Sequence, residues 1–436
     1  MNATTTVQIP HYSVLVVGGG QAGLSMSYYL QQAGIDHLVF EKSTAMHVWS
    51  DRRWDSFCLV TPNWQCNLPG HPYAGNDPHG FMKKNEIVEY LAAFKAKVAA
   101  PIHEGVTVQK VTARPQGGFD VSTSEGRYTT DQVVVASGGY HTPVIPRLAE
   151  RLPASVMQVH SEQYRNADAL PEGAVLVVGS GQSGAQIAED LHLAGRKVFL
   201  AVGGAPRCAR FYRGKDVVDW LADMNYYDMP VDLHPLREGV RDNTNHYVTG
   251  RDGGRDIDLR RFANEGMELY GTLDGLEGES LRFKPDLTAN LDGADKVYNG
   301  INASIDKWIE KNGIDALPGG AYEPLWTPTG ERTSLSLAEA GVSAIVWCIG
   351  FHPDFAWLDL PVFNGRGQAG HVRGVSRYPG IYFLGLPWLY TWGSGRFSGV
   401  SRDAAHLASC IERYASSLVT SLQAGSEVTE PERSAA

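Results

Sequence analysis

The sequence predicts an α/β protein in which one doubly wound nucleotide-binding unit is inserted into another. A strand, a glycine turn, a helix and a second strand follow one another over residues 13–41, and the same order returns over 174–202. Two more apolar strands, within 133–139 and 344–350, each end at a small-residue turn. Two Rossmann-like units of this kind in one chain predict two dinucleotide sites.

The first unit begins with a continuous apolar run, Ser13–Val17, as a strand buried on both faces requires. The turn behind it carries Gly18, Gly20 and Gly23. In this pattern the first glycine permits the tight turn, the second lets the backbone approach a pyrophosphate, and the third allows close packing of helix on strand. Glu41 ends the next strand, where a carboxylate can accept a hydrogen bond from a ribose hydroxyl. The alternative is an ordinary glycine turn with a surface glutamate.

The second unit repeats the glycine turn but not the acid. The residue at the place of Glu41 is Val202, and Arg207 and Arg210 follow without an intervening carboxylate. Arginine can grip a 2′-phosphate with two parallel hydrogen bonds, whereas an acid would repel it. We therefore expect NADPH to be preferred over NADH, with these two arginines as phosphate ligands, unless they belong to a solvated face. The glycines of this turn are Gly179, Gly181 and Gly184.

Composition narrows the classes of partner. Hydrophobic residues make up 43% of the 436 residues and charged residues 20%, as in a globular protein. The net charge of −10 argues against nucleic acid and anionic membrane as partners. We find no apolar run long enough to span a membrane and no secretory signal in residues 1–11, so we expect a cytoplasmic protein. A homodimer is left open.

The cysteines and the domain boundaries complete the prediction. The five cysteines form no C-x-x-C pair, so we expect reduced thiols, and no metal cluster is evident. A flavin disulfide reductase, which needs such a pair, is therefore disfavoured. We expect an FAD-binding domain in two parts, with an NADPH-binding domain and its insertion between them, and we place no elements within 225–330. The boundaries are 1–165 and 343–417 for the FAD domain, 170–342 for the NADPH domain, and 418–436 for a flexible tail.

Four further segments resemble those of the flavin-containing monooxygenases, including the plant YUCCA-like enzymes and their bacterial relatives. They are Trp49–Gly70, Cys348–Asp354, Tyr378–Gly385 and Gly393–Ala405. A narrower likeness is to flavin-dependent oxidoreductases of bacterial nitrilase gene clusters. The resemblance implies that NADPH reduces a bound FAD. The reduced flavin then takes up O₂ as a C4a-hydroperoxide, which transfers one oxygen atom to a small organic substrate.

The same resemblance assigns residues to the site. Asn63 matches the active-site asparagine of that family, although it could equally be a turn residue after Pro62. The remaining cofactor-binding residues that we expect, beside the glycines, Glu41 and the two arginines, are Gln21, Lys42, Trp49, Trp54, Thr61, Ser137, Gly138, Gln182, Ser183, Gly350, Phe351 and Gly385.

One family fingerprint is only half present. His160 and Tyr164 keep its second half, but Ala154 and Val156 stand where phenylalanine and glycine are usual. Two alternatives to a monooxygenase therefore stay open. One is an NADPH oxidase or dehydrogenase that yields H₂O₂ or passes electrons to another acceptor. The other is a non-catalytic flavin-binding protein.

Overall fold

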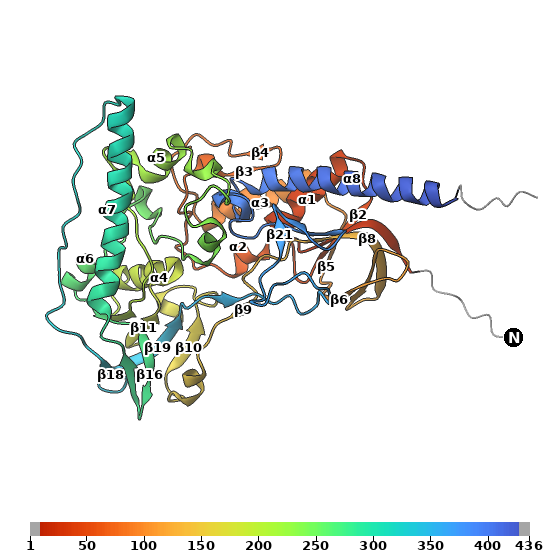
Figure 1. Ribbon diagram of the computed structural model, residues 1–436. Helices are drawn as coiled ribbons and strands as arrows, with labels where there is room; N and C mark the ends of the chain where they lie inside the picture. Colours follow the sequence, from red (N-terminus) through yellow and green to blue (C-terminus); the bar gives the residue numbers. More distant parts are fainter. Residues whose placement is uncertain (1–8, 427–436) are drawn as a thin grey trace, which may run out of the picture.

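The structure, a computed structural model, describes residues 9–426, with side chains to residue 417. Figure 1 shows two halves side by side, each with its own sheet. The first half holds the N-terminal strands and the helices α1, α3 and α8, and the second holds α4, α6 and α7. In the described part of the chain, no helix is both long and apolar enough to cross a membrane.

Within residues 9–426, nine strands form the first sheet, in the order β21-β22-β23-β8-β1-β2-β5, and β7 pairs with both β8 and β6. Its centre is parallel, with Val17 of β1 opposite both Phe40 of β2 and Val135 of β8. The strands are β1 (His11–Val17), β2 (His37–Glu41), β5 (Ile102–Glu104), β6 (Val108–Ala113), β7 (Phe119–Thr123), β8 (Arg127–Val135), β21 (His371–Val372), β22 (Val375–Ser376) and β23 (Ile381–Phe383).

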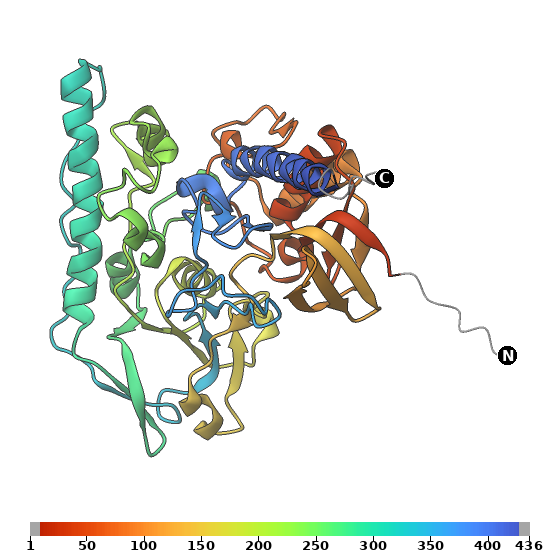
Figure 2. The same ribbon diagram turned by 45° about the vertical axis from the view of Figure 1, so that its right-hand side comes forward.

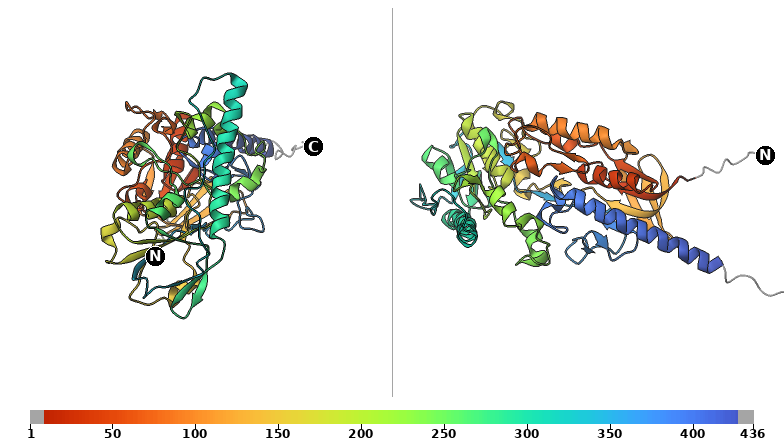
Figure 3. Two further views of the ribbon diagram at one scale, coloured as in Figure 1. Left: turned by 90° about the vertical axis from the view of Figure 1, so that its left-hand side faces the viewer. Right: turned by 90° about the horizontal axis from the view of Figure 1, so that it is seen from above.

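Three helices cover one face of this sheet and share one apolar core with its central strands. Seen from above, they lie next to one another along the first half (Figure 3, right). They are α1 (Gln21–Gln32), α3 (Lys84–Val98) and α8 (Val400–Ser426), and the short elements nearby are α2 (His47–Asp51), β3 (Asn67–Leu68) and β4 (His71–Pro72). The tail that we expected from 418 is thus helical to Ser426, and the remainder of that prediction lies outside the described residues.

The second sheet is parallel throughout, with five strands in the order β10-β19-β11-β12-β15 among residues 9–426. Val178 of β11 lies opposite both Ala201 of β12 and Trp347 of β19, which repeats the arrangement around Val17. The predicted α/β fold class with an inserted second unit is confirmed. The strands are β10 (Met157–His160), β11 (Ala174–Val178), β12 (Val198–Ala201), β15 (Glu268–Tyr270) and β19 (Val342–Trp347).

Two short strands carry the chain between the halves and correct the predicted boundaries. β9 (Thr142–Pro143) leads into the second half, β20 (Phe351–His352) leads back, and the two pair antiparallel. Boundaries at 165 and 342 would leave β10 and β19 outside the second sheet, although both are hydrogen-bonded within it. Local sequence could not show this, because strand order within a sheet is a long-range property.

Residues 203–333, most of which were left without predicted elements, wrap the outer side of the second sheet. The helix α7 stands at the edge of the molecule, with the chain after it running back alongside (Figures 2 and 3). The elements of this region are β13 (Phe211–Tyr212), β14 (Lys215–Asp216), α5 (Val217–Asp223), α6 (Leu259–Asn264), β16 (Leu273–Glu277), β17 (Ser280–Phe283) and α7 (Leu287–Asn312). The helix α4 (Gln182–Leu193) precedes the region, and the strand β18 (Ser334–Ser336) follows it.

Candidate functional site

The first glycine turn joins β1 to α1, and its three glycines have different physical reasons. Gly18 has a φ of 115°, and a Cβ there would lie 2.6 Å from the carbonyl oxygen of Ala136. A Cβ on Gly23 would overlap the carbonyl oxygen of Gly18. Gly20 differs, because its φ of −79° suits any residue and no described atom lies within 4 Å of its Cβ position. The protein itself does not require glycine at 20, so the space is suited to a ligand that approaches the backbone.

The second turn, between β11 and α4, repeats this geometry. A Cβ on Gly179 would lie 2.6 Å from the carbonyl oxygen of Cys348, and one on Gly184 would overlap that of Gly179. Gly181 has a φ of −66°, and its nearest described neighbour is the Thr244 methyl group, 3.7 Å from the Cβ position. Among described residues, neither helix has a side chain capping its N-terminus or an acid in its first turn. Both therefore present free N–H groups to an anion such as a pyrophosphate.

The two turns differ at the end of the strand that follows each helix, where the chain passes beside the glycine turn. We call this place the rim of the turn. The Glu41 carboxylate accepts hydrogen bonds from the N–H groups of Gly19 at 2.7 Å and Ser43 at 2.9 Å. In the second turn, Val202 stands in the place of Glu41. The Ser180 hydroxyl accepts the bond from Gly203 N–H there, at 3.0 Å. The first rim is therefore held by a charged acceptor and the second by a neutral one.

The structure places the predicted phosphate ligands Arg207 and Arg210 in buried ion pairs, and their role in phosphate binding stays a prediction. Their side chains are only 3% and 1% exposed, and each is paired with a carboxylate. Arg207 binds Asp295 at 2.8 Å and lies between the rings of Tyr298 and Tyr322. Arg210 pairs with Asp216 and donates to the carbonyl oxygen of Val60 at 2.6 Å. Because each charge already has a carboxylate partner, the arrangement favours a structural role for both arginines.

Comparison with known proteins identifies a family model and relatives that are similar to this chain in sequence. The model of the pyridine nucleotide-disulphide oxidoreductase family matches residues 15–223. An uncharacterized CzcO-like oxidoreductase of Geobacillus kaustophilus is 33% identical over 400 residues, which cover 90% of this chain and 96% of that one. A probable indole-3-pyruvate monooxygenase of Arabidopsis thaliana, YUCCA4, is 29% identical over 179 residues, 41% of this chain and 43% of that one.

The fold is also similar to that of a solved structure. A double mutant of the flavin monooxygenase of Stenotrophomonas maltophilia superposes with a TM-score of 0.65 at 19% identity, over 93% of this chain and all of that one. The chain belongs to the flavin-containing monooxygenase family. It is an oxidoreductase, and the family's cofactors are FAD and NADPH. The two open glycine turns fit the pyrophosphates of two such dinucleotides.

Two segments border the turns: the first linker joins β8 to β9, and the second linker joins β19 to β20. A Cβ on Gly18 would lie 2.9 Å from the Cα of Ser137, and one on Gly179 would lie 3.3 Å from the side chain of Ile349. The Ser137 hydroxyl is buried and has no hydrogen-bond partner among the described residues. Because buried hydroxyl groups are normally paired, this orphan is suited to a bound ligand. Each linker thus begins beside one turn and runs to the paired crossing of β9 and β20.

Other predicted residues gather around the same places. A Cβ on Gly385 would lie 2.7 Å from the Cβ of Ala22 in α1, which brings the C-terminal segment to the first turn. Phe351 packs against Tyr140 and His160 at the crossing, where His160 Nε2–H donates to the carbonyl oxygen of Gly350 at 3.1 Å. Burial lowers the pKa of His160, which favours this neutral, hydrogen-bonding form. The cofactor roles of five further residues stay predictions; these residues are Gln21, Lys42, Thr61, Gly138 and Ser183.

Two predicted residues have structural roles. The Asn63 side chain is buried, its Nδ2 donates to the carbonyl oxygen of Asp77 at 2.9 Å, and its Oδ1 accepts from Met82 N–H at 2.7 Å. It therefore ties the 3₁₀ turn Asn63–Gln65 to the loop before α3, and the turn interpretation is supported. One Nδ2 proton is left for a cofactor or substrate. Trp54 lies in the core cluster of the second half, in edge contact with Phe57, which favours a packing role, and its flavin contact stays a prediction.

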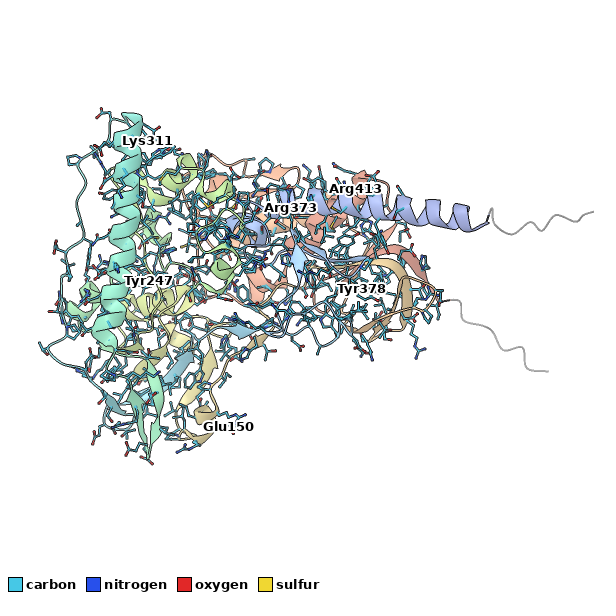
Figure 4. The ribbon with its side chains drawn as sticks, in the orientation of Figure 1. Glu150, Tyr247, Lys311, Arg373, Tyr378 and Arg413 are labelled. Atoms are coloured by element: carbon cyan, nitrogen blue, oxygen red, sulfur yellow. The ribbon has the colours of Figure 1, made fainter. Side chains whose placement is uncertain are left out.

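Sequence reasoning missed the strap, residues 243–250, which crosses the second turn. The side chains of Gln182 and Gln186 in α4 both donate to the carbonyl oxygen of Val248, at 2.7 and 3.2 Å. Thr244 then lies over Gly181. The strap falls in the region without predicted elements, and its polar sequence carried no signal. Figure 4 labels Tyr247 of the strap, and also Arg373, which lies in the turn between β21 and β22.

Proposed function

We propose that this chain is an NADPH-dependent FAD monooxygenase that inserts one oxygen atom from O₂ into a small organic substrate. The observation that carries the proposal is the pair of open helix N-termini at Gly20 and Gly181. Both turns border linkers that lead to one crossing, so two dinucleotides bound there would extend towards the same junction. An enzyme that binds only one dinucleotide would not need a second turn of this shape.

The rims support one assignment of the two turns. Glu41 at the first rim can accept a hydrogen bond from a ribose hydroxyl and suits FAD. Val202 and Ser180 at the second rim bring no negative charge, which suits the 2′-phosphate of NADPH. With Arg207 and Arg210 paired elsewhere, the support for NADPH is the missing carboxylate at this rim and not an arginine grip.

Each residue around the junction has a task in this proposal. The first-turn N–H groups of α1 and α4 would hold the pyrophosphates, and the Ser137 hydroxyl would donate to the flavin nucleotide. When bound, the flavin carries two electrons from NADPH to O₂, so that one oxygen atom enters the substrate and the other leaves as water. Aromatic side chains such as Trp49, packed on Phe397 at 4.9 Å, would exclude water from that step.

A second candidate is an NADPH oxidase that releases H₂O₂. The observation in its favour is the missing half of the fingerprint. His160 still fixes the crossing through Gly350, but Val156 is buried in the core of the second sheet. The lost half therefore leaves the fold intact, and its effect would fall on how NADP⁺ is held during turnover.

One experiment separates these candidates. The purified yellow protein is mixed with NADPH without air, and then ¹⁸O₂ is admitted with a panel of amines, thioethers, ketones and keto acids. We expect the flavin to bleach and ¹⁸O to appear in one class of product, with less than one H₂O₂ per NADPH. Bleaching with stoichiometric H₂O₂ and no labelled product from any panel member would favour the oxidase. A flavin that NADPH does not bleach would favour a non-catalytic protein.

A further inference from the structure

Two arginines and five aromatic side chains form a band at the junction between the halves, which we call the cationic band. The Arg53 guanidinium lies over the rings of Trp49 and Phe57, 5.2 and 5.4 Å from their centres. Arg396 lies 3.8 Å from the centre of Trp392, whose ring is 4.4 Å from that of Tyr227. The two parts are joined because Trp49 packs on Phe397, the residue after Arg396.

Neither arginine of the cationic band has a carboxylate within 4 Å in the part of the chain that the structure describes. Their neighbours do: Arg52 binds Glu162 at 2.9 Å, and Arg402 binds Asp228 at 2.8 Å. Arg53 donates to the carbonyl oxygen of Arg52. Arg396 donates to the carbonyl oxygen of Trp392 and, at 2.7 Å, to Asn245 Oδ1 in the strap. With five N–H groups each, both retain donors for an outside acceptor.

Both guanidinium groups are half-buried, so their charges are partly desolvated. Burial lowers the pKa of Arg53 to about 10 and lowers the pKa of Arg396. The contact of Trp49 with Phe397 places both arginines at the same junction between the halves. Glu162 is also within range of Arg53, but it is already paired with Arg52. Two desolvated cations at one place favour an anionic ligand.

We propose that Arg53 and Arg396 bind the carboxylate of the substrate, so that the enzyme oxygenates an organic acid with an apolar body. The proposal rests on the proposed monooxygenase function and adds the substrate class. The apolar body would lie against Trp49, Phe397 and Trp392. A nucleotide pyrophosphate is also an anion, but the free N–H groups at the start of α4 already supply its donors, and the Arg53 guanidinium lies over the aromatic rings of Trp49 and Phe57.

The test measures binding and needs no turnover. Phenylacetate and its neutral isostere phenylacetamide are titrated into the FAD-loaded protein, and perturbation of the flavin spectrum and quenching of tryptophan fluorescence are followed. We expect phenylacetate to bind about tenfold or more tightly than the amide. Arg53→Gln and Arg396→Gln should each remove that difference while leaving amide binding unchanged. Arg53→Lys, which keeps the charge but loses the fork, should restore part of it.

Two controls make the outcome decisive. Arg213→Gln removes an arginine that is paired with Asp306, and it should leave both affinities unchanged. The Kd for NADP⁺, measured on the same variants, separates the two sources of an anion. If Arg53→Gln and Arg396→Gln weaken NADP⁺ and not phenylacetate, the band binds the nucleotide phosphate and the proposal is wrong. Equal affinity of the wild-type protein for acid and amide would also overturn it. Failure of the ¹⁸O experiment with intact phenylacetate selectivity would overturn the monooxygenase and keep the anion site.

Discussion

The two glycine turns of this chain are built alike and finished differently. In both, the backbone forces glycine at the first and third positions, and the second position is open. The first turn has a carboxylate at its rim, whereas the second has a neutral rim and is crossed by the strap. The comparison teaches that the turn itself specifies a pyrophosphate, while the rim and the covering segments specify which dinucleotide is bound.

The largest effect should come from Gly20→Val. Because no described protein atom lies within 4 Å of its Cβ position, the variant should fold, but its side chain would occupy the place of the pyrophosphate. We expect colourless protein with unchanged circular dichroism, and flavin content measured after denaturation should be near zero. Gly23→Val is the contrast, because its side chain would overlap Gly18 and prevent folding. A yellow, fully loaded Gly20→Val protein would remove the first turn from the FAD site.

Gly181→Val should separate the two turns. The protein should stay yellow, because the first turn is untouched, but anaerobic reduction by NADPH should slow about 100-fold or more, since the pyrophosphate could no longer approach the backbone. Thr244 lies 3.7 Å from the Cβ position, so the double variant with Thr244→Ala is the control. Rescue of reduction by Thr244→Ala would show that the strap, and not the cofactor, had been displaced.

Arg207→Ala should affect stability and leave the choice of nucleotide unchanged. The side chain is 3% exposed, bound to Asp295 and held between two tyrosine rings. Its loss should lower the free energy of unfolding by about 3 kcal/mol in urea titrations, because a buried pair is broken. The exposed pair of Arg282 with Glu277 provides a control that should cost less than about 1 kcal/mol. A selective rise in the KM for NADPH over NADH would restore Arg207 as a phosphate ligand.

The pairing of Arg207 shows what the sequence could and could not reveal. Gly18 and Gly23 were predictable because their constraints are local: a positive φ in one case and packing of α1 on the turn in the other. The partner of Arg207 was not, because Asp295 lies 88 residues further along the chain, and only the folded helix α7 brings it there. Spacing along a sequence therefore identified the phosphate-binding turn, but it could not decide whether a nearby charge was free.

The poorly predicted elements have similar reasons. α7 carries Gly293 and Gly300 in its interior, which lower its intrinsic helix propensity, although its apolar residues pack against the second half. β10 and β19 were placed in the wrong unit because their pairing partners lie far away in sequence. β10 pairs with β19, and β19 also pairs with β11. The resemblance supplied the segments around the first turn, but it could not show that Asn63 holds a loop or that Trp54 belongs to the second core.

The helices behind the turns extend the contrast to pH. α1 buries small and apolar residues, whereas α4 buries Glu189 and Asp190 against charged partners from other segments. Asp190 accepts from Ser56 of the first half at 2.5 Å and from Tyr164 at 2.7 Å. Glu189 is only 1% exposed and lies 3.3 Å from Arg255, and burial raises its pKa to about 7.

The sign of this shift sets the smallest predicted effect. Between its ordinary pKa of 4.5 and about 7, Glu189 keeps its proton in the folded state and loses it in the unfolded state. The folded state therefore binds more protons, and its stability falls as pH rises through that window, by up to about 3 kcal/mol. Glu189→Gln mimics the neutral acid, so we expect it to raise the free energy of unfolding at pH 8 and to change it little at pH 4.5. Arg255 keeps Asp252 as a partner at 3.2 Å, which limits the cost of the substitution. If the variant were equally destabilised at both values of pH, the ion pair with Arg255 would outweigh the desolvation of the carboxylate, and α4 would be stabilised by charge rather than merely tolerating it.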